Sequence, residues 1–416
     1  MNLNRRSFLA VPALALPTLA GGSAVAQAAT AQPVLTGAEQ LAAQGWRPLA
    51  GRKLGVLSNP TGVLANGDHI VDSMVAAGVR PVAAFGPEHG FRGSAQAGGS
   101  EGDYNDPRTG IPVYDAYGAD AAKLASLFTK AGLDTVVFDI ADVGARFYTY
   151  IWSLYTAMLA AANVGAAFVV LDRPNPIGSR LAGPVLDPKF ASGVGLKPIA
   201  QQHGMTVGEL ARFFAAEFLP GDGAQLKHLE VIQVRGWRRD GFFADTGLRW
   251  VLPSPNMPTP DTALVYPGTG MFEGTVFSEG RGTTRPFEIV GAHGLDWRWR
   301  DELEKLHLPG AAFREVYFVP TFSKFVNETC GGVQLTVTEP QVFDAVRTAV
   351  AMLVTAKRIA PDKFGWRPDQ VIDKLSGSAR LRTMVDAGAG IDEITGAWRA
   401  ELGDFGRRRR PYLIYR

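Results

Sequence analysis

Short apolar runs alternate with helical stretches along the first half of the chain. The apolar runs, which predict buried strands, lie at 53–58, 79–85, 134–139, 166–171 and 229–234. Between them, amphipathic or apolar stretches predict helices at 68–77, 119–131, 147–162 and 205–218. Runs of this length that are apolar throughout are typical of parallel strands buried on both faces. The pattern therefore predicts an α/β fold, in which a Rossmann-like parallel sheet carries helices on both faces.

The pattern changes near Trp250. Residues 251–290 are rich in Pro, Gly, Thr and Ser, and we expect long ordered loops there. Shorter elements return after Leu295, with a strand predicted at 333–337 and a helix at 341–356. We therefore expect a catalytic domain at 29–250 and a smaller α+β domain at 251–416.

The first 28 residues have the features of an export signal. Arg5-Arg6 precedes an apolar stretch that runs to about Ala20, and Ala26-Gln27-Ala28 is typical of a cleavage site. An uncleaved membrane anchor is the alternative, but the apolar stretch is short and two prolines interrupt it. The segment 1–28 therefore predicts twin-arginine export, removal of the signal, and a periplasmic or extracellular protein without a membrane span.

Composition excludes few classes of protein. The chain is 46% hydrophobic and 20% charged, as ordinary globular proteins are. Removing the export signal leaves 40 basic and 40 acidic residues, so its charge gives no reason to expect nucleic acid as a partner. Cys330 is the only cysteine, which excludes an intrachain disulfide. No GxGxxG, Walker or HExxH motif is present, so the sequence implies neither a cofactor nor a metal.

Polar residues gather directly after the predicted strands. The carboxyl ends of parallel strands meet at one edge of a sheet, where ligands bind. Four such clusters lie at 58–61, 86–93, 139–150 and 172–178. We expect all four to open on the same edge, which is the strongest indication of function that the pattern gives.

Glu88 is the candidate catalytic acid. Pro87 and Gly90 favour a fixed turn around it, while His89 and Arg92 are close enough in sequence to orient its carboxyl. A general acid for a glycosidic oxygen must hold its proton near neutral pH, which burial favours and an adjacent arginine opposes. The structural alternative is a helix cap or an ion pair with Arg92.

Asp142 is the candidate for a second catalytic carboxyl, because common glycosidases use a pair. Asp139 is a candidate binding residue, although an aspartate here also suits a helix cap. Arg146, Tyr148 and Tyr150 follow, and a cation beside aromatic rings suits a sugar with an acidic substituent. Packing at the start of the helix is an equally good reading of the two tyrosines.

Further candidate binding residues come from three other segments. They are Asn59, Asp172 and Asn175 after predicted strands, and Asn256, Glu273, Glu279 and Arg281 in the segment 251–290. Prolines on both sides of Asn175 fix its backbone, which suits either a binding residue or an elaborate structural turn. Glu273 and Glu279 are also reserve candidates for the second carboxyl.

At these residues the chain resembles a family of exo-β-N-acetylmuramidases, formerly a family of unknown function. The matching segments, in order, are FGPEHGFRG (85–93), DVGARFYTY (142–150), LDRPNPIG (171–178), HGMTVGELA (203–211), PSPNMPT (253–259) and EGTVFSEGRGTTRPFE (273–288). Each segment is weak alone, but the ordered set is highly specific. Ala141 departs from the family pattern, which is expected to have glutamine there, and this puts one sugar contact or loop hydrogen bond in doubt.

The resemblance implies a Rossmann-like domain, a smaller second domain and a cleft between them. It also implies release of N-acetylmuramic acid from the non-reducing end of peptidoglycan fragments, with Glu88 at the position of the leading catalytic candidate. The lactyl carboxylate of that sugar needs a cation, which makes Arg92, Arg146 and Arg281 binding hypotheses. The alternatives are a non-catalytic cell-wall sugar-binding protein and a different hydrolase, such as a deacetylase, on the same sheet.

Overall fold

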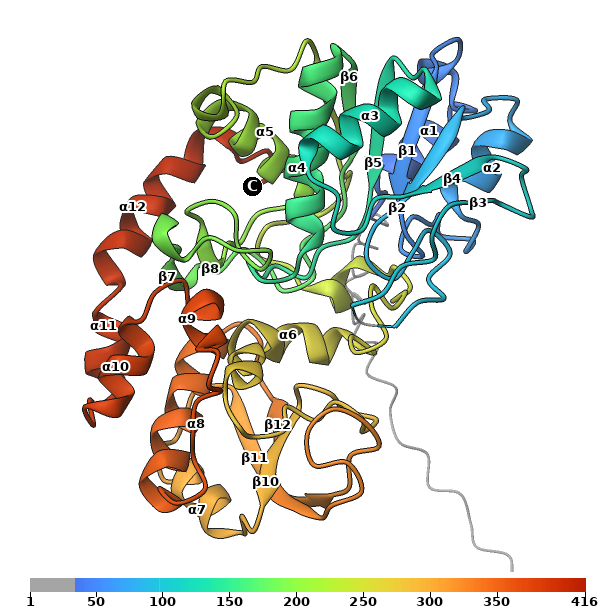
Figure 1. Ribbon diagram of the computed structural model, residues 1–416. Helices are drawn as coiled ribbons and strands as arrows, with labels where there is room; N and C mark the ends of the chain where they lie inside the picture. The colour runs from blue at the N-terminus through green and yellow to red at the C-terminus, as the bar shows by residue number, and fades with distance from the viewer. Residues whose placement is uncertain (1–33, 97) are drawn as a thin grey trace, which may run out of the picture. The chain divides into compact units, whose positions relative to one another are not determined.

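The computed structural model describes residues 34–96 and 98–416, which belong to one compact unit (Figure 1). The export signal predicted at 1–28 lies outside the described residues. Within the described part of the chain, no helix is both long enough and apolar enough to cross a membrane.

A seven-stranded sheet forms the framework of the N-terminal part. Its order is β3-β4-β2-β1-β5-β6-β9, and all neighbours are parallel except the edge strand β3, which runs antiparallel to β4. The strands are β1 (Leu54–Ser58), β2 (Ala83–Gly86), β3 (Tyr104–Asn105), β4 (Pro112–Asp115), β5 (Thr135–Asp139), β6 (Ala167–Leu171) and β9 (Leu229–Ile232). The predicted parallel α/β sheet is therefore confirmed. Its strand order reverses between β1 and β5, which is where open sheets of this kind bind ligands.

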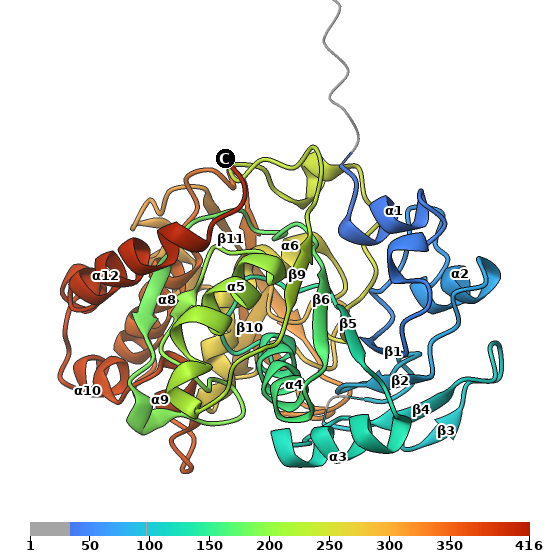
Figure 2. The same cartoon turned by 90° about the horizontal axis from the view of Figure 1, so that it is seen from above.

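Helices cover both faces of this sheet (Figure 2). The helices are α1 (Gly37–Ala42) and α2 (Ile70–Ala76) on one face, and α3 (Ala121–Ala131), α4 (Tyr150–Val164) and α5 (Val207–Glu217) on the other. The two-residue period of a strand explains how one sequence serves two cores. In β5, Val137 joins the core under α1 and α2, whereas Val136 and Phe138 join the core under α3 to α5.

The C-terminal part is a smaller α+β structure. Its antiparallel sheet has the order β10-β12-β11. The elements are α6 (Pro260–Thr269), β10 (Ile289–His293), α7 (Arg298–Glu304), β11 (Ala311–Phe318), β12 (Cys330–Val337) and α8 (Ala345–Ile359). One hydrophobic core runs from α4 and α5 into this part. The predicted domain boundary at 250/251 stays a prediction.

The prediction of loops throughout 251–290 is wrong, because α6, the 3₁₀ helix η5 (Gly270–Gly274) and part of β10 lie there. The Thr259 hydroxyl caps α6 by accepting from the backbone N–H of Thr262 at 3.2 Å, and Pro260 occupies the first turn, where its missing N–H costs nothing. Gly268 allows close packing on α8, since a Cβ there would lie 1.9 Å from the carbonyl oxygen of Ala345. Proline and glycine thus build this helix instead of breaking it.

The sequence pattern also misplaces the start of one strand and does not locate several short elements that complete the fold. The strand predicted at 79–85 begins only at Ala83. The remaining elements are β7 (Ala182–Val185), β8 (Ala200–Gln202), α9 (Val371–Ser376), α10 (Arg380–Asp386), α11 (Ile391–Gly396), α12 (Arg399–Arg409) and the 3₁₀ helices η1 (Arg47–Leu49), η2 (Pro188–Phe190), η3 (Pro220–Asp222), η4 (Phe243–Thr246) and η6 (Arg410–Tyr412).

The C-terminal segment returns to the N-terminal sheet. The helix α12 packs against β7, and the backbone N–H of Ile414 donates to Glu209 on α5 at 2.7 Å. The Tyr415 hydroxyl donates to the buried carboxylate of Asp172 just after β6. The chain end therefore forms part of the framework of the N-terminal part.

Candidate active site

Glu88 lies in the loop directly after β2. Its Oε1 atom accepts from the backbone N–H of Gly98 at 2.9 Å, and its Oε2 atom accepts from the Thr149 hydroxyl at 3.2 Å. The next residue, His89, has a left-handed backbone with φ of 70°, which is unusual for a residue with a side chain and is typical of strained functional loops. The loop therefore holds a partly exposed carboxyl in a defined orientation.

The structure does not pair Glu88 with Arg92. The Arg92 guanidinium instead bonds Asp72 at 2.8 Å and Asp106 at 2.7 Å. A second glutamate, Glu101, shapes the loop by accepting from the backbone N–H of Phe91 at 2.9 Å. The charged side chains of Arg92 and Glu101 therefore bond other groups of the protein and do not pair with the Glu88 carboxyl.

Three tyrosines form a wall next to Glu88. The Tyr150 hydroxyl lies 2.7 Å from the Pro253 carbonyl oxygen and 3.3 Å from that of Glu88. The ring of Tyr148 packs edge-on against those of Tyr150 and Tyr266, with centroids 5.3 and 5.7 Å apart. Burial raises the pKa of Tyr148 and Tyr266 well above the ordinary value, so both phenols stay neutral. The wall connects the Glu88 loop to α6.

Asp142 is buried after β5. Its Oδ2 atom accepts from the backbone N–H of Gly144 at 2.7 Å and lies 3.1 Å from Nε2 of His203. Its Oδ1 atom, Nδ2 of Asn59 and the Tyr148 hydroxyl have no hydrogen-bond partner among the described residues. Buried polar atoms normally have partners, and exceptions are often functional. The ends of β1 and β5 thus gather unsatisfied polar atoms.

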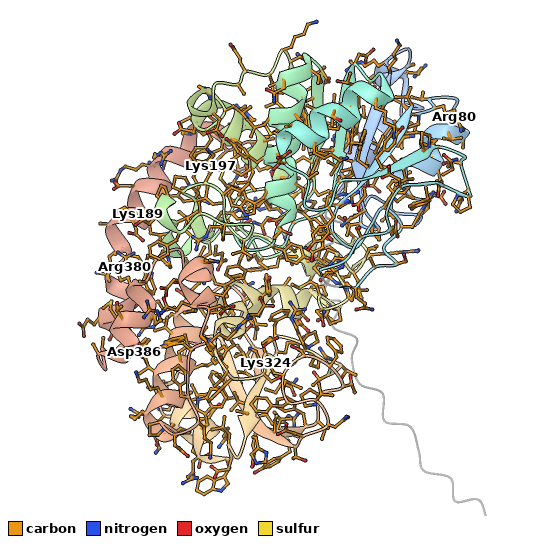
Figure 3. All side chains as sticks on the ribbon, viewed as in Figure 1. Arg80, Lys189, Lys197, Lys324, Arg380 and Asp386 are labelled. Carbon is orange, nitrogen blue, oxygen red and sulfur yellow. The ribbon has the colours of Figure 1, made fainter. Side chains whose placement is uncertain are left out.

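A network of ion pairs lies next to Tyr266, at the end of the tyrosine wall away from Glu88. Arg281 bonds Glu273 at 2.5 Å and lies 3.4 Å from Glu279, which Lys324 binds at 2.8 Å. The Arg281 guanidinium lies over the ring of Phe287, which in turn packs against Tyr266. Lys324 lies in the C-terminal part of the protein (Figure 3). Burial raises the pKa of Glu273, and Arg281 opposes that rise.

Asp139 and Arg146, both candidate binding residues, lie in structural networks. Asp139 is fully buried in a two-bond ion pair with Arg173, at 2.5 and 2.8 Å. The fully buried Arg146 donates to the carbonyl oxygens of Pro184, Ile199 and Leu375 at 2.8 to 3.0 Å. Their predicted substrate contacts stay predictions.

Asn175 and Asn256 also lie within the protein. Asn175 bridges a turn by donating to the Met205 carbonyl at 3.0 Å and accepting from the Ile177 N–H at 3.1 Å. Asn256 is buried in the loop before α6. A series of contacts therefore links Glu88, Tyr150, Tyr148, Arg281, Glu273 and Glu279 through Tyr266 and Phe287, and Asn59 and Asp142 lie at the ends of the neighbouring strands β1 and β5.

Asp172 is expected to make stability depend on pH. It accepts from Gly208 N–H and the Thr206 hydroxyl at 2.7 and 2.8 Å, and burial raises its pKa to about 7. The folded state then holds a proton that the unfolded state releases near pH 4, so this contribution is present at pH 4 and lost as pH rises through about 7. At about 1.4 kcal/mol per pKa unit, it amounts to a few kcal/mol.

The measurement is the free energy of unfolding at pH 5 and at pH 8, for the wild type and for Asp172→Asn. The wild type should lose more stability than the variant between the two values. Equal losses would show that Asp172 titrates alike in the folded and unfolded states.

Three side chains of the candidate site, those of Tyr117, Thr149 and Tyr266, are not among the candidates that the sequence predicts. Tyr266 lies on α6, in a segment that the sequence predicts as loop. Tyr117 lines the same cavity as Glu88 and follows β4, a strand that the sequence pattern does not predict. Thr149 stands inside the segment DVGARFYTY, where its place just before α4 was a usable signal. Within residues 34–96 and 98–416, no group of three or more His, Cys, Asp or Glu side chains is placed to hold a metal ion.

The fold and the site define a Rossmann-like α/β protein with a carboxyl and a tyrosine wall at the ligand-binding edge of its sheet. Two family models described as Exo-beta-N-acetylmuramidase NamZ match the chain, the N-terminal one over residues 54–261 and the C-terminal one over 264–415. The chain therefore belongs to the NamZ family of exo-β-N-acetylmuramidases, and the resemblance seen in its motifs is confirmed.

Known relatives agree over nearly the whole length. The chain is 43% identical to the peptidoglycan β-N-acetylmuramidase NamZ of Bacillus subtilis (strain 168), over 94% of this chain and 93% of that protein. Crystal structures of two DUF1343 family proteins from Bacteroides fragilis NCTC 9343 superpose with TM-scores of 0.83 and 0.73. Each is 31% identical and covers 92% of this chain and 99% of its own.

Proposed function

We propose that this protein is an exo-acting glycoside hydrolase that releases N-acetylmuramic acid from the non-reducing end of peptidoglycan fragments. Family membership and the Bacillus subtilis relative support the substrate class. The observation that carries the chemistry is the partly exposed Glu88 carboxyl, which Gly98 and Thr149 hold beside a wall of neutral tyrosines.

Glu88 acts as the general acid. It donates a proton to the glycosidic oxygen while the bond from that oxygen to the anomeric carbon breaks. Water supplies the hydroxyl group that the anomeric carbon gains, and the proton from that water passes to a second base. Asp142 is the proposed second carboxyl, because its Oδ2 atom is fixed and its Oδ1 atom has no partner among the described residues.

Arg281 is the proposed cation for the lactyl carboxylate. Arg146 is fully buried against three carbonyl oxygens, whereas Arg92 and Arg281 each pair with two carboxylates, and what favours Arg281 is its place next to the tyrosine wall. Arg281 is partly exposed and continues the tyrosine wall through Phe287. A guanidinium suits a planar carboxylate because it can donate two parallel bonds.

The direct test is incubation of the folded protein with a disaccharide that has N-acetylmuramic acid at its non-reducing end. We expect free N-acetylmuramic acid, identified by mass spectrometry. Binding without release would instead favour the sugar-binding alternative, and loss of acetate with an intact disaccharide would favour a deacetylase.

Export through the twin-arginine route is proposed from residues 1–28. The double variant Arg5→Lys, Arg6→Lys keeps the charge but removes the paired arginines of that signal. We expect it to accumulate inside the cell, measured by fractionation and immunoblotting, while the wild type is exported and shortened. Equal export of the two would contradict the proposed route.

A further inference from the structure

A groove of about 780 Å³ begins at Glu88 and runs along α4. One wall is the exposed face of α4, with Ser153, Thr156 and Leu159, and the opposite wall is the segment that leads into α3. Pockets of about 300–1,000 Å³ usually take ligands larger than one small ring. The groove is therefore too large for the single sugar that an exo-acting enzyme removes.

The far end of the groove is closed by a polar cluster. Lys197 (labelled in Figure 3) bonds Asp222 at 2.6 Å and lies over the ring of Tyr155. Tyr155 also donates its hydroxyl proton to Asp222. The Lys197 ammonium and the Asp222 carboxylate neutralise each other. This end of the groove can therefore hydrogen-bond a ligand but carries no net charge.

The middle of the groove suits an uncharged ligand rich in hydroxyl groups. Ser153 and Thr156 contribute hydroxyls, and Asp120 caps α3 by accepting from the Lys123 N–H at 2.8 Å. Tyr117 lines the mouth with 41% of its surface exposed. An exposed aromatic ring that can face a sugar, with hydroxyls behind it, is a common way to bind neutral carbohydrate.

Glu88 lines the start of this groove, and its backbone carbonyl oxygen accepts from the Tyr150 hydroxyl of the tyrosine wall at 3.3 Å. Burial and then the nearby Glu88 carboxylate raise the pKa of Tyr117 in the groove, and Glu88 also contributes to the raised pKa of Tyr266 in the wall. A general acid protonates the oxygen that joins the released sugar to the rest of the glycan. The glycan beyond the cleaved bond must then start next to Glu88, where the groove begins.

We propose that the groove along α4 binds the leaving glycan, and that it takes more than one sugar beyond the cleaved bond. This assignment rests on the proposed muramidase activity. Contacts with remote sugars contribute binding energy that lowers the barrier at the reacting centre. The enzyme should therefore prefer longer unbranched glycans over the disaccharide.

The test compares a disaccharide with a tetrasaccharide, both without peptide and both with N-acetylmuramic acid at the non-reducing end. The readout is kcat/KM for release of the first N-acetylmuramic acid. For the wild type we expect a ratio of tetrasaccharide to disaccharide of about ten, because remote binding energy appears in kcat/KM. Thr156→Trp fills the groove and should reduce this ratio to about one.

Asn163→Trp is the matched control. Asn163 lies two helical turns further along α4, is exposed, and does not line the groove, so this variant should keep the wild-type ratio. A wild-type ratio near one, or an unchanged ratio in Thr156→Trp, overturns the assignment. Failure of the wild type to cleave either substrate would count against the proposed function itself.

Discussion

Replacing Glu88 with glutamine is expected to lower kcat for release of N-acetylmuramic acid by about 10²–10⁴-fold, the usual contribution of a general acid. Glutamine keeps the shape of the side chain, and its oxygen can still accept from Gly98 or Thr149. It has no acidic proton for the leaving oxygen. Initial rates on the disaccharide, with circular dichroism and thermal unfolding on both proteins, separate lost chemistry from lost folding.

Glu101→Gln is the matched control in the same loop. Glu101 accepts from the backbone N–H groups of Phe91, Arg92 and Ser94 at 2.9 to 3.2 Å, and these bonds outweigh burial and lower its pKa. Its replacement should mainly lower the free energy of unfolding, because a charged hydrogen-bond acceptor is lost, and should affect kcat much less than Glu88→Gln does. Full activity in Glu88→Gln would remove that residue from the chemistry and direct attention to Asp142, Glu273 and Glu279.

Arg146→Met is expected to cost about 3–5 kcal/mol of the free energy of unfolding, because it removes a charged donor from three buried carbonyl oxygens, of which that of Ile199 also accepts from the Leu186 N–H at 3.2 Å. Those carbonyls belong to Pro184, Ile199 and Leu375, so one guanidinium joins β7, the approach to β8, and α9. Methionine fills a similar volume without any donor. Urea denaturation followed by fluorescence measures the difference.

Arg298→Met is the control for this substitution. Arg298 is 65% exposed and its side chain pairs with Asp296, so its replacement should leave the free energy of unfolding close to that of the wild type. A urea midpoint for Arg146→Met equal to that of the wild type would contradict the prediction and would mean that the three carbonyl oxygens find other donors.

The sequence was informative where local rules decide the structure. Apolar runs located the parallel strands, and parallel strands necessarily gather their carboxyl ends. For this reason Asn59, Glu88 and Asp142, which follow the neighbouring strands β1, β2 and β5, could be grouped before any coordinates.

The sequence was less informative where partners are distant. Arg146 stands among polar residues after a strand and looks like a binding residue, yet one of its acceptors lies 229 positions further along the chain. Asp139 has the same appearance and is neutralised by Arg173. Residue type and spacing do not distinguish a cation that binds substrate from one that ties the framework, because the difference lies in long-range packing.

The docking of the last residues has a consequence for folding during synthesis. Ile414 and Tyr415 supply hydrogen bonds to Glu209 and Asp172, so the N-terminal part lacks some of its framework until these two residues have been synthesised. A nascent chain would hold the buried Asp172 carboxyl without the Tyr415 hydroxyl. The N-terminal part is therefore expected to reach its final stability only after the segment that holds Ile414 and Tyr415 has docked on it.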